Sequence, residues 1–88
     1  MNPIIKARRV EAVFAVVSAD YPHLFNPDNP VPLKIGIRQD LHAVYEGRIS
    51  HRKIGDFMCV WAALPKYVEA RDSATCRYGL DGKEYPVQ

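Results

Sequence analysis

The chain has 88 residues, of which 48% are hydrophobic, and a formal net charge of +2 at pH 7. This length predicts one domain over residues 1–88, with a core over about residues 8–87, and the composition excludes an intrinsically disordered chain. The small charge excludes binding to nucleic acid through a large overall excess of cations, so any such binding must depend on where the cations lie.

The cysteines and the apolar runs restrict the class of protein further. Cys59 and Cys76 form no CxxC pair and have no zinc-binding spacing with the histidines, so we expect two buried thiols in a reducing compartment. No apolar run reaches the roughly 18 residues of a membrane span, and the N-terminus lacks the order of a signal peptide. These observations predict a cytoplasmic protein without a metal or another cofactor.

The first third of the chain predicts one helix and a stiff connector. Apolar residues recur at i, i+3, i+4 and i+7 from Val10 to Val17, which predicts a helix over residues 8–19. Residues 26–32 contain three prolines, which favour a stiff connector over a helix. Leu24 and Phe25 are expected to anchor this connector to the core.

Residues 32–41 combine an alternating apolar run, a glycine and the start of a helix. Apolar residues alternate with polar residues or glycine over residues 33–37, which predicts a short half-buried strand. Gly36 lies where the strand changes to a helix, a place where the backbone needs unusual freedom. Lys34 and Arg38 flank this joint. Because the first N–H groups of a helix are unpaired, the joint is suited to hold an anion.

Three helices are predicted downstream of this joint. The second helix covers residues 38–45 and ends before Gly47, a glycine typical of a helix C-terminus. The third begins after Ser50, a good N-cap, and continues to about residue 62 because large apolar residues recur at helical spacing. The fourth covers residues 65–70 and starts with a proline, which is common at the first helical position.

The C-terminal part predicts a β-hairpin. Residues 75–78 and 83–87 flank Asp81-Gly82, and an Asp-Gly pair between two short runs is a strong hairpin signal. Two strands alone are marginally stable, so we expect the hairpin to pair with the strand at residues 33–37. The predicted fold class is mainly α with a small β-sheet. It consists of four to five helices and a C-terminal hairpin that pairs with a short central strand.

Enzymatic and metal-binding patterns are absent from the sequence. It has no GxxxxGK phosphate loop, no HExxH and no GxSxG. His23, His42 and His51 are far apart and show no metal spacing. We therefore predict a protein that is not an enzyme, with no catalytic residue and no metal site.

The start of the third predicted helix carries a cluster of cations. Arg52 and Lys53 lie in its first turn with His51, and Ser50 caps the helix. Cations at this end oppose the helix dipole. Two interpretations remain open: solvated charge on a loop, or a site where free N–H groups and cations meet the phosphates of a nucleic acid.

A second set of cations is interleaved with aromatic residues. It comprises Lys66, Tyr67, Arg71 and Arg77, with Tyr78 and Tyr85 nearby. This mixture suits single-stranded nucleic acid, because each ring stacks on a base with about 1–3 kcal/mol and the cations meet phosphates. The alternative is that Tyr67 and Tyr78 are half-buried residues of the core.

These segments form a recognisable combination. The blocks are Tyr-Pro-His-Leu-Phe at residues 21–25, Pro-Leu-Lys-Ile-Gly-Ile at 32–37 and Gln-Asp-Leu at 39–41, followed by Lys66-Tyr67, Arg77 and Leu-Asp-Gly at 80–82. Together they resemble the ProQ/FinO domain of bacterial RNA chaperones, over roughly residues 8–82. The resemblance implies a largely helical fold with a small sheet.

The resemblance also implies a function. A domain of this family binds structured RNA, typically the base of a terminator hairpin and its single-stranded 3′ tail. It acts as a chaperone and post-transcriptional regulator of small RNAs, and we expect it to be a monomer.

The resemblance assigns site residues by position. Lys34, Tyr67 and Arg77 would line a pocket for the RNA 3′ end, with Gly36 permitting close approach of the backbone. The start of the third helix would meet stem phosphates. The full set of expected RNA-binding residues is Lys34, Gly36, Ser50, His51, Arg52, Lys53, Lys66, Tyr67 and Arg77.

Three positions depart from the pattern of this family. Lys66 stands where arginine is common, which keeps the charge but loses a bidentate donor. Gly55 and Cys59 occupy the exposed face of the third helix, where the family often carries arginines. A weaker grip on the RNA backbone is therefore expected.

Two other functions are compatible with the sequence. The third and fourth helices could form a helix-turn-helix of a DNA-binding regulator, although the fourth is short for reading a major groove. Trp61 and the tyrosines could instead form the surface of a protein-interaction module, although Trp61 fits the apolar stripe of the core.

Overall fold

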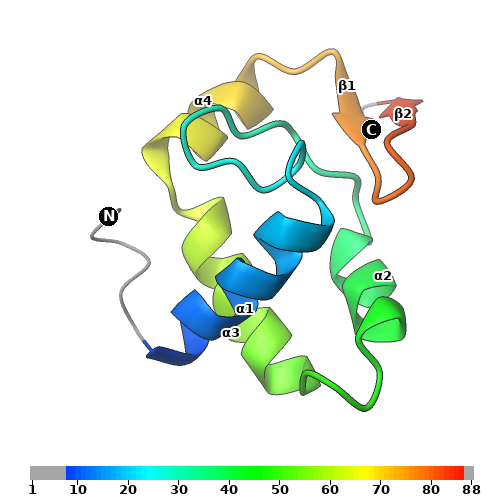
Figure 1. The fold of residues 1–88 in the computed structure, drawn as a ribbon. Coiled ribbons are helices and arrows are strands. Elements are labelled where there is room, and N and C mark those ends of the chain that lie inside the picture. Colours follow the sequence, from blue (N-terminus) through cyan, green and yellow to red (C-terminus); the bar gives the residue numbers. More distant parts are fainter. Residues whose placement is uncertain (1–7, 87–88) are drawn as a thin grey trace.

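The structure, a computed structural model, describes residues 8–86 (Figure 1). Within these residues, four helices precede a two-stranded antiparallel hairpin. The elements are α1 (Arg8–Asp20), α2 (Ile37–Val44), α3 (His51–Ala62), α4 (Pro65–Asp72), β1 (Cys76–Tyr78) and β2 (Glu84–Pro86). The predicted fold class is confirmed, and none of the described helices is long and apolar enough to cross a bilayer.

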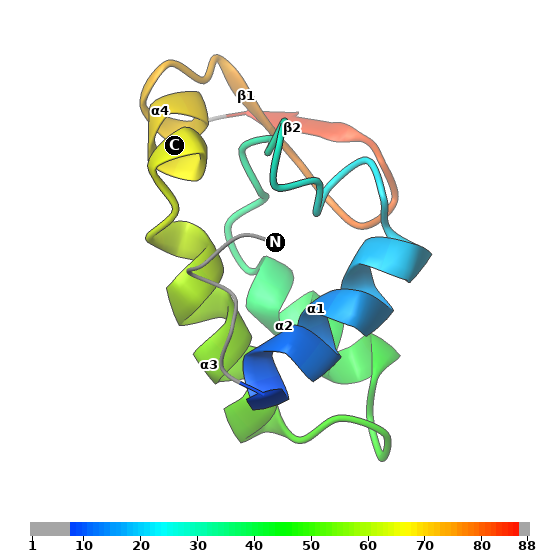
Figure 2. The same ribbon diagram turned by 60° about the vertical axis from the view of Figure 1, so that its left-hand side comes forward.

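Helix α3 packs against each of the other helices in the described part of the chain (Figures 1 and 2). Its buried side carries Ile54, Phe57 and Trp61, as the apolar spacing predicts. The Phe57 and Trp61 rings each lie 5.6 Å from the Phe25 ring, with interplanar angles of 62° and 67°. Aromatic quadrupoles favour this edge-on packing. Cys59 lies outside this stripe and is exposed, so the prediction of a buried thiol is wrong for Cys59.

The connector between α1 and α2 is fixed at both ends. Leu24 and Phe25 are buried, as predicted, and anchor it to the core. The buried Tyr45 hydroxyl donates a hydrogen bond to Asp20 Oδ2 at 2.6 Å, which ties the end of α2 to the end of α1. Burial raises the pKa of Tyr45 most, and this hydrogen bond raises it further, so the hydroxyl remains a donor at neutral pH.

The predicted strand over residues 33–37 is wrong in its extent. Leu33 forms an isolated parallel bridge with Tyr78, supported by Lys34 N–H to Tyr78 O and Tyr78 N–H to Pro32 O, both 2.8 Å. The chain then turns, and α2 begins at Ile37. Gly36 has φ 92° and redirects the backbone, which leaves Ile35 59% exposed instead of buried. The predicted pairing with the hairpin therefore exists at one residue.

The hairpin lies within the predicted segments, and Val87 falls outside the described residues. Arg77 and Tyr85 are directly opposite each other, so their side chains leave the same face of the hairpin. The connection spans residues 79–83, longer than a two-residue turn. It is closed by Gly79 N–H donating to Lys83 O at 3.2 Å, and Lys83 N–H donates to Asp81 Oδ1 inside it at 2.9 Å. Helix α4 continues to Asp72, beyond the predicted residue 70.

Candidate nucleic-acid interface

Two side chains from distant elements converge on the backbone of Leu33. The Leu33 N–H donates to the Tyr67 hydroxyl at 3.4 Å, and Arg77 Nη1 donates to the Leu33 carbonyl at 3.0 Å. Tyr67 is 6% exposed, while Arg77 is half-buried and its Nε has no hydrogen-bond partner within residues 8–86. These contacts hold the segment that carries Lys34, but Tyr67 and Arg77 do not line the cavity beside Lys34.

Lys34 makes two contacts of its own. Its Nζ lies 2.8 Å from Asp40 Oδ2 and 4.9 Å from the centroid of the Tyr85 ring. The hydrogen bond to Asp40 raises the pKa of Lys34, so the amine is charged at neutral pH. Because the side chain is 29% exposed, an anion can reach the amine by competing with Asp40.

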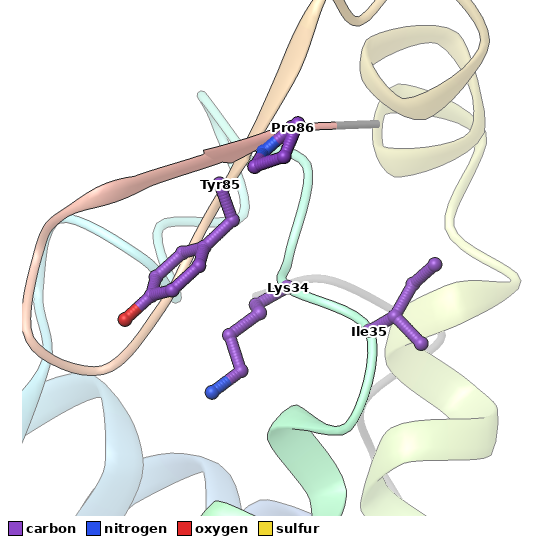
Figure 3. A pocket seen from close by; sticks show the side chains of 4 residues that line it. All are labelled: Lys34, Ile35, Tyr85 and Pro86. Carbon is purple, nitrogen blue, oxygen red and sulfur yellow. The ribbon is translucent and has the colours of Figure 1, made fainter. Parts of the chain in front are cut away.

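A small cavity lies beside Lys34. Its volume is about 190 Å³, and its lining residues are Lys34 and Ile35 from the segment before α2 and Tyr85 and Pro86 from β2 (Figure 3). Ile35 is absent from the predicted site residues, and Tyr85 is expected only as a neighbour of the second set of cations and aromatic residues. The exposed position of Ile35 follows from the turn at Gly36, and Tyr85 reaches the cavity through the pairing of β2, neither of which a local pattern reveals.

Gly36 is the N-cap residue of α2 and has left-handed backbone geometry. A methyl group at this position would find Gln39 Oε1 at 4.0 Å as its nearest neighbour. The left-handed φ angle therefore explains why a glycine occupies this position. Close approach of an RNA backbone to Gly36 remains a prediction.

The start of α3 has the predicted cap. Ser50 Oγ accepts a hydrogen bond from Lys53 N–H at 3.2 Å, and the side chains of His51, Arg52 and Lys53 are exposed. A cavity of about 290 Å³ lies next to this cap and is lined by residues 46–51. The predicted cluster therefore stands at an open helix start, where unpaired N–H groups and cations favour an anion.

Two histidines stack at this end of α3. The rings of His42 and His51 are 4.0 Å apart and nearly parallel, at 6°. His51 Nε2 also lies 3.4 Å from Glu46 Oε2. Burial, then the proximity of His51 and Arg38, lowers the pKa of His42. His42 and Glu46 belong to this site although the sequence pattern does not assign them to it.

Gly55 is buried, so the prediction that it lies on an exposed face of α3 is wrong. A methyl group there would stand 2.8 Å from Arg38 Nη2 and 3.3 Å from Arg38 Cζ. Because Gly55 has no side chain, the Arg38 guanidinium of α2 has room to lie over α3 at this position. Arg38 itself is exposed, so a cation stands on this face although α3 does not supply it.

Helix α2 connects the cationic site around Lys34 with the cationic site at the start of α3. Lys34 precedes its start, Arg38 and His42 lie four residues apart on one face of the helix, and Glu46 lies in the turn after its end. The helix has 8 residues, about 12 Å at about 1.5 Å per residue. The hairpin lies near its start and the beginning of α3 near its end (Figure 1).

Lys66 lies apart from these groups. It is exposed on α4 and lines a depression of about 280 Å³ with Pro27, Asp28, Leu64 and Pro65. Lys34 and Arg77 do not line that depression. The structure therefore does not bring Lys66 into the group around Leu33. Within residues 8–86, no cluster of acidic, histidine or cysteine side chains is able to hold a metal ion.

The fold and these groups define a small, mainly helical domain with cationic sites at the hairpin and at the start of a capped helix. The sequence profile of the ProQ/FINO family matches residues 7–86, and the chain belongs to this family. Comparison with curated proteins and with solved structures gave no match. Membership implies an RNA-binding chaperone role, and the family is not enzymatic.

Proposed function

We propose that the chain recognises the base of terminator hairpins and their single-stranded 3′ tails, and that it acts on small RNAs as a cytoplasmic, monomeric chaperone and post-transcriptional regulator. The observation that supports this proposal best is that Tyr67 and Arg77 hold the backbone of Leu33, which adjoins Lys34 and the cavity that Lys34 lines.

In this proposal the start of α3 binds the stem. The cap leaves helix N–H groups available, and Arg52 and Lys53 are exposed beside them. Contacts of this kind hold a nucleic-acid backbone in position without reading its sequence. Arg38 extends the cationic surface from α3 onto α2.

The 3′ tail would then follow α2 toward Lys34. The length of this helix, about 12 Å, corresponds to a few nucleotides at about 3.4 Å per step. A stem at α3 and a tail at Lys34 are therefore compatible with one short RNA. Tyr67 and Arg77 act in this arrangement by holding the Leu33 backbone.

A helix-turn-helix function has less support from the structure. Helix α4 has 8 residues, and its Tyr67 is buried. A partner surface built on Trp61 is wrong, because that side chain is fully buried in the core. Competition of bound RNA by duplex DNA separates the DNA-binding function from the RNA-binding one.

The proposal is tested with a terminator hairpin that carries or lacks its 3′ tail. We expect the full chain to bind the tailed hairpin more tightly, and its affinity to fall as salt rises because about five phosphates are neutralised. Arg77→Ala should reduce the preference for the tail, because the Leu33 carbonyl loses its donor. Arg71→Ala is the matched control, because Arg71 lies on α4 and pairs with Asp72. Equal affinity for the two hairpins would contradict the proposed 3′-end site.

A further inference from the structure

The cavity beside Lys34 has the composition of a nucleotide-binding subsite. It contains an aromatic ring, an exposed aliphatic side chain and a cation, supplied by Tyr85, Ile35 and Lys34 (Figure 3). Its volume of about 190 Å³ is below the roughly 300 Å³ at which pockets for drug-sized ligands begin. The cavity therefore suits a smaller group, such as a single base with its ribose.

Tyr85 is the tyrosine whose ring faces this cavity. The family resemblance assigns Tyr67 to the 3′-end site, but Tyr67 is 6% exposed and its hydroxyl is engaged with Leu33 N–H. Tyr85 is only half-buried and lines the cavity. A base that stacks at this end of the molecule therefore meets Tyr85.

The Tyr85 ring is held in place before any ligand arrives. Its hydroxyl donates to Asp81 Oδ2 at 2.6 Å, and the Lys34 amine lies over the ring. This hydrogen bond raises the pKa of Tyr85 and lowers that of Asp81, so donor and acceptor keep their roles at neutral pH. A group fixed in this way loses little conformational freedom on binding.

Gly79 makes this position of the ring possible. A methyl group on Gly79 would lie 2.8 Å from Tyr85 Cε2, 3.0 Å from Asp81 Oδ1 and 3.4 Å from Lys34 Cδ. The ring, the carboxylate that holds it and the stem of the lysine thus all pack over one glycine. An alanine there would displace the ring without removing it.

We propose that Tyr85 is a stacking platform for one unpaired nucleotide of the RNA, whose phosphate binds Lys34 in exchange for Asp40. This inference rests on the proposed function and adds to it a residue and a subsite. In this exchange the Lys34 amine moves from the ring to the phosphate, a flat base lies against the ring, and Ile35 and Pro86 provide its apolar surroundings. Stacking of this kind tolerates any base, because each base has an aromatic face.

The test measures binding of two RNAs, a terminator hairpin with a 3′ oligouridine tail and the same hairpin without it, to the full chain. Tyr85→Leu keeps an apolar side chain but removes the aromatic face. We expect affinity for the tailed hairpin to fall about 5- to 150-fold, with the tailless hairpin unaffected. Gly79→Ala should weaken tail binding in the same direction, and Tyr85→Phe should largely retain it.

The matched control is Glu84→Gln, an exposed neighbour on β2, which should change neither affinity. A second measurement uses 4-thiouridine in the tail, which we expect to crosslink to the peptide that contains Tyr85. Unchanged tail affinity in Tyr85→Leu would overturn the proposal. An equal loss for both hairpins would also overturn it, since Tyr85 would then support the fold. Wild-type protein that binds neither RNA would instead refute the proposed function.

Discussion

At the scale of single residues, Gly36 carries a clear backbone constraint. Its φ of 92° lies in the left-handed region, and it ends the one-residue bridge at Leu33 so that α2 starts at Ile37. A side chain has room at this position, because the nearest atom is 4.0 Å away. Any cost of substitution therefore comes from the backbone angle and not from a clash.

We predict that Gly36→Ala lowers the free energy of unfolding by about 1–2 kcal/mol, the cost of left-handed geometry for an L-residue. Urea denaturation of the two proteins measures this difference. Gly47→Ala tests the same explanation at a second position, because Gly47 has φ 78° and a methyl group added there would meet no atom within 4 Å. We expect a similar loss there, and unchanged stability in both variants would contradict the explanation.

Local motifs at this scale could be predicted from the sequence, and tertiary ones could not. Ser50 as an N-cap and Asp81-Gly82 as a hairpin signal depend on neighbouring residues, and the structure has both. The place of Tyr85 beside Lys34 depends on how β2 pairs with β1 and how β1 meets Leu33. No spacing along the chain encodes that approach.

At the scale of elements, α2 and α3 meet at a glycine. The Arg38 guanidinium of α2 covers Gly55 of α3, at a distance that leaves no space for a methyl group. The guanidinium is the far end of a flexible side chain, so it can move away at little cost. The contact therefore positions the cation and contributes little to stability.

We expect Gly55→Ala to raise the free energy of unfolding by about 0.5–1 kcal/mol, because alanine is the better helix former and Arg38 can move. The same variant should bind the tailless hairpin more weakly, because Arg38 no longer lies over α3. Arg38→Ala provides the comparison and should lose a similar amount of affinity. A stable Gly55→Ala protein with wild-type affinity would show that this placement of Arg38 has no role in binding.

The helices could be predicted well and the central strand could not. Apolar spacing located α1 and α3, because each buries one face of the helix, and the proline at its first position located α4. Alternation at residues 33–37 suggested a strand, yet Ile35 is exposed. Alternation over only five residues does not distinguish a strand from a one-residue bridge followed by a turn. The left-handed φ of Gly36 produces the turn.

At the scale of the whole molecule, the titration of His42 makes stability depend on pH. His42 is half-buried and stacks on His51, with Arg38 and Glu46 also near it. Its pKa is lowered below the usual 6.5. The unfolded chain therefore binds more protons than the folded chain as the pH falls through about 6.5, and stability decreases in that direction.

We predict that wild-type stability is highest above about pH 6.5 and falls as the solution is acidified toward the pKa of folded His42. Urea midpoints between about pH 5.5 and pH 8 measure this trend. His42→Gln should flatten it, whereas His23→Gln, at an exposed position of the connector, should not. An equally steep trend in His42→Gln would assign the titration to another group.

The ion pair between Lys34 and Asp40 has a consequence for the ions that accompany binding. Neutralising about five phosphates of a single strand releases counterions with a slope of about 3.5 in log K against log salt. If a phosphate replaces Asp40 as the ion-pair partner of Lys34, the freed Asp40 carboxylate binds a cation from solution. Ion uptake by the protein then offsets part of the release from the RNA. The measured slope of log K against log salt would therefore indicate fewer phosphate contacts than the complex contains.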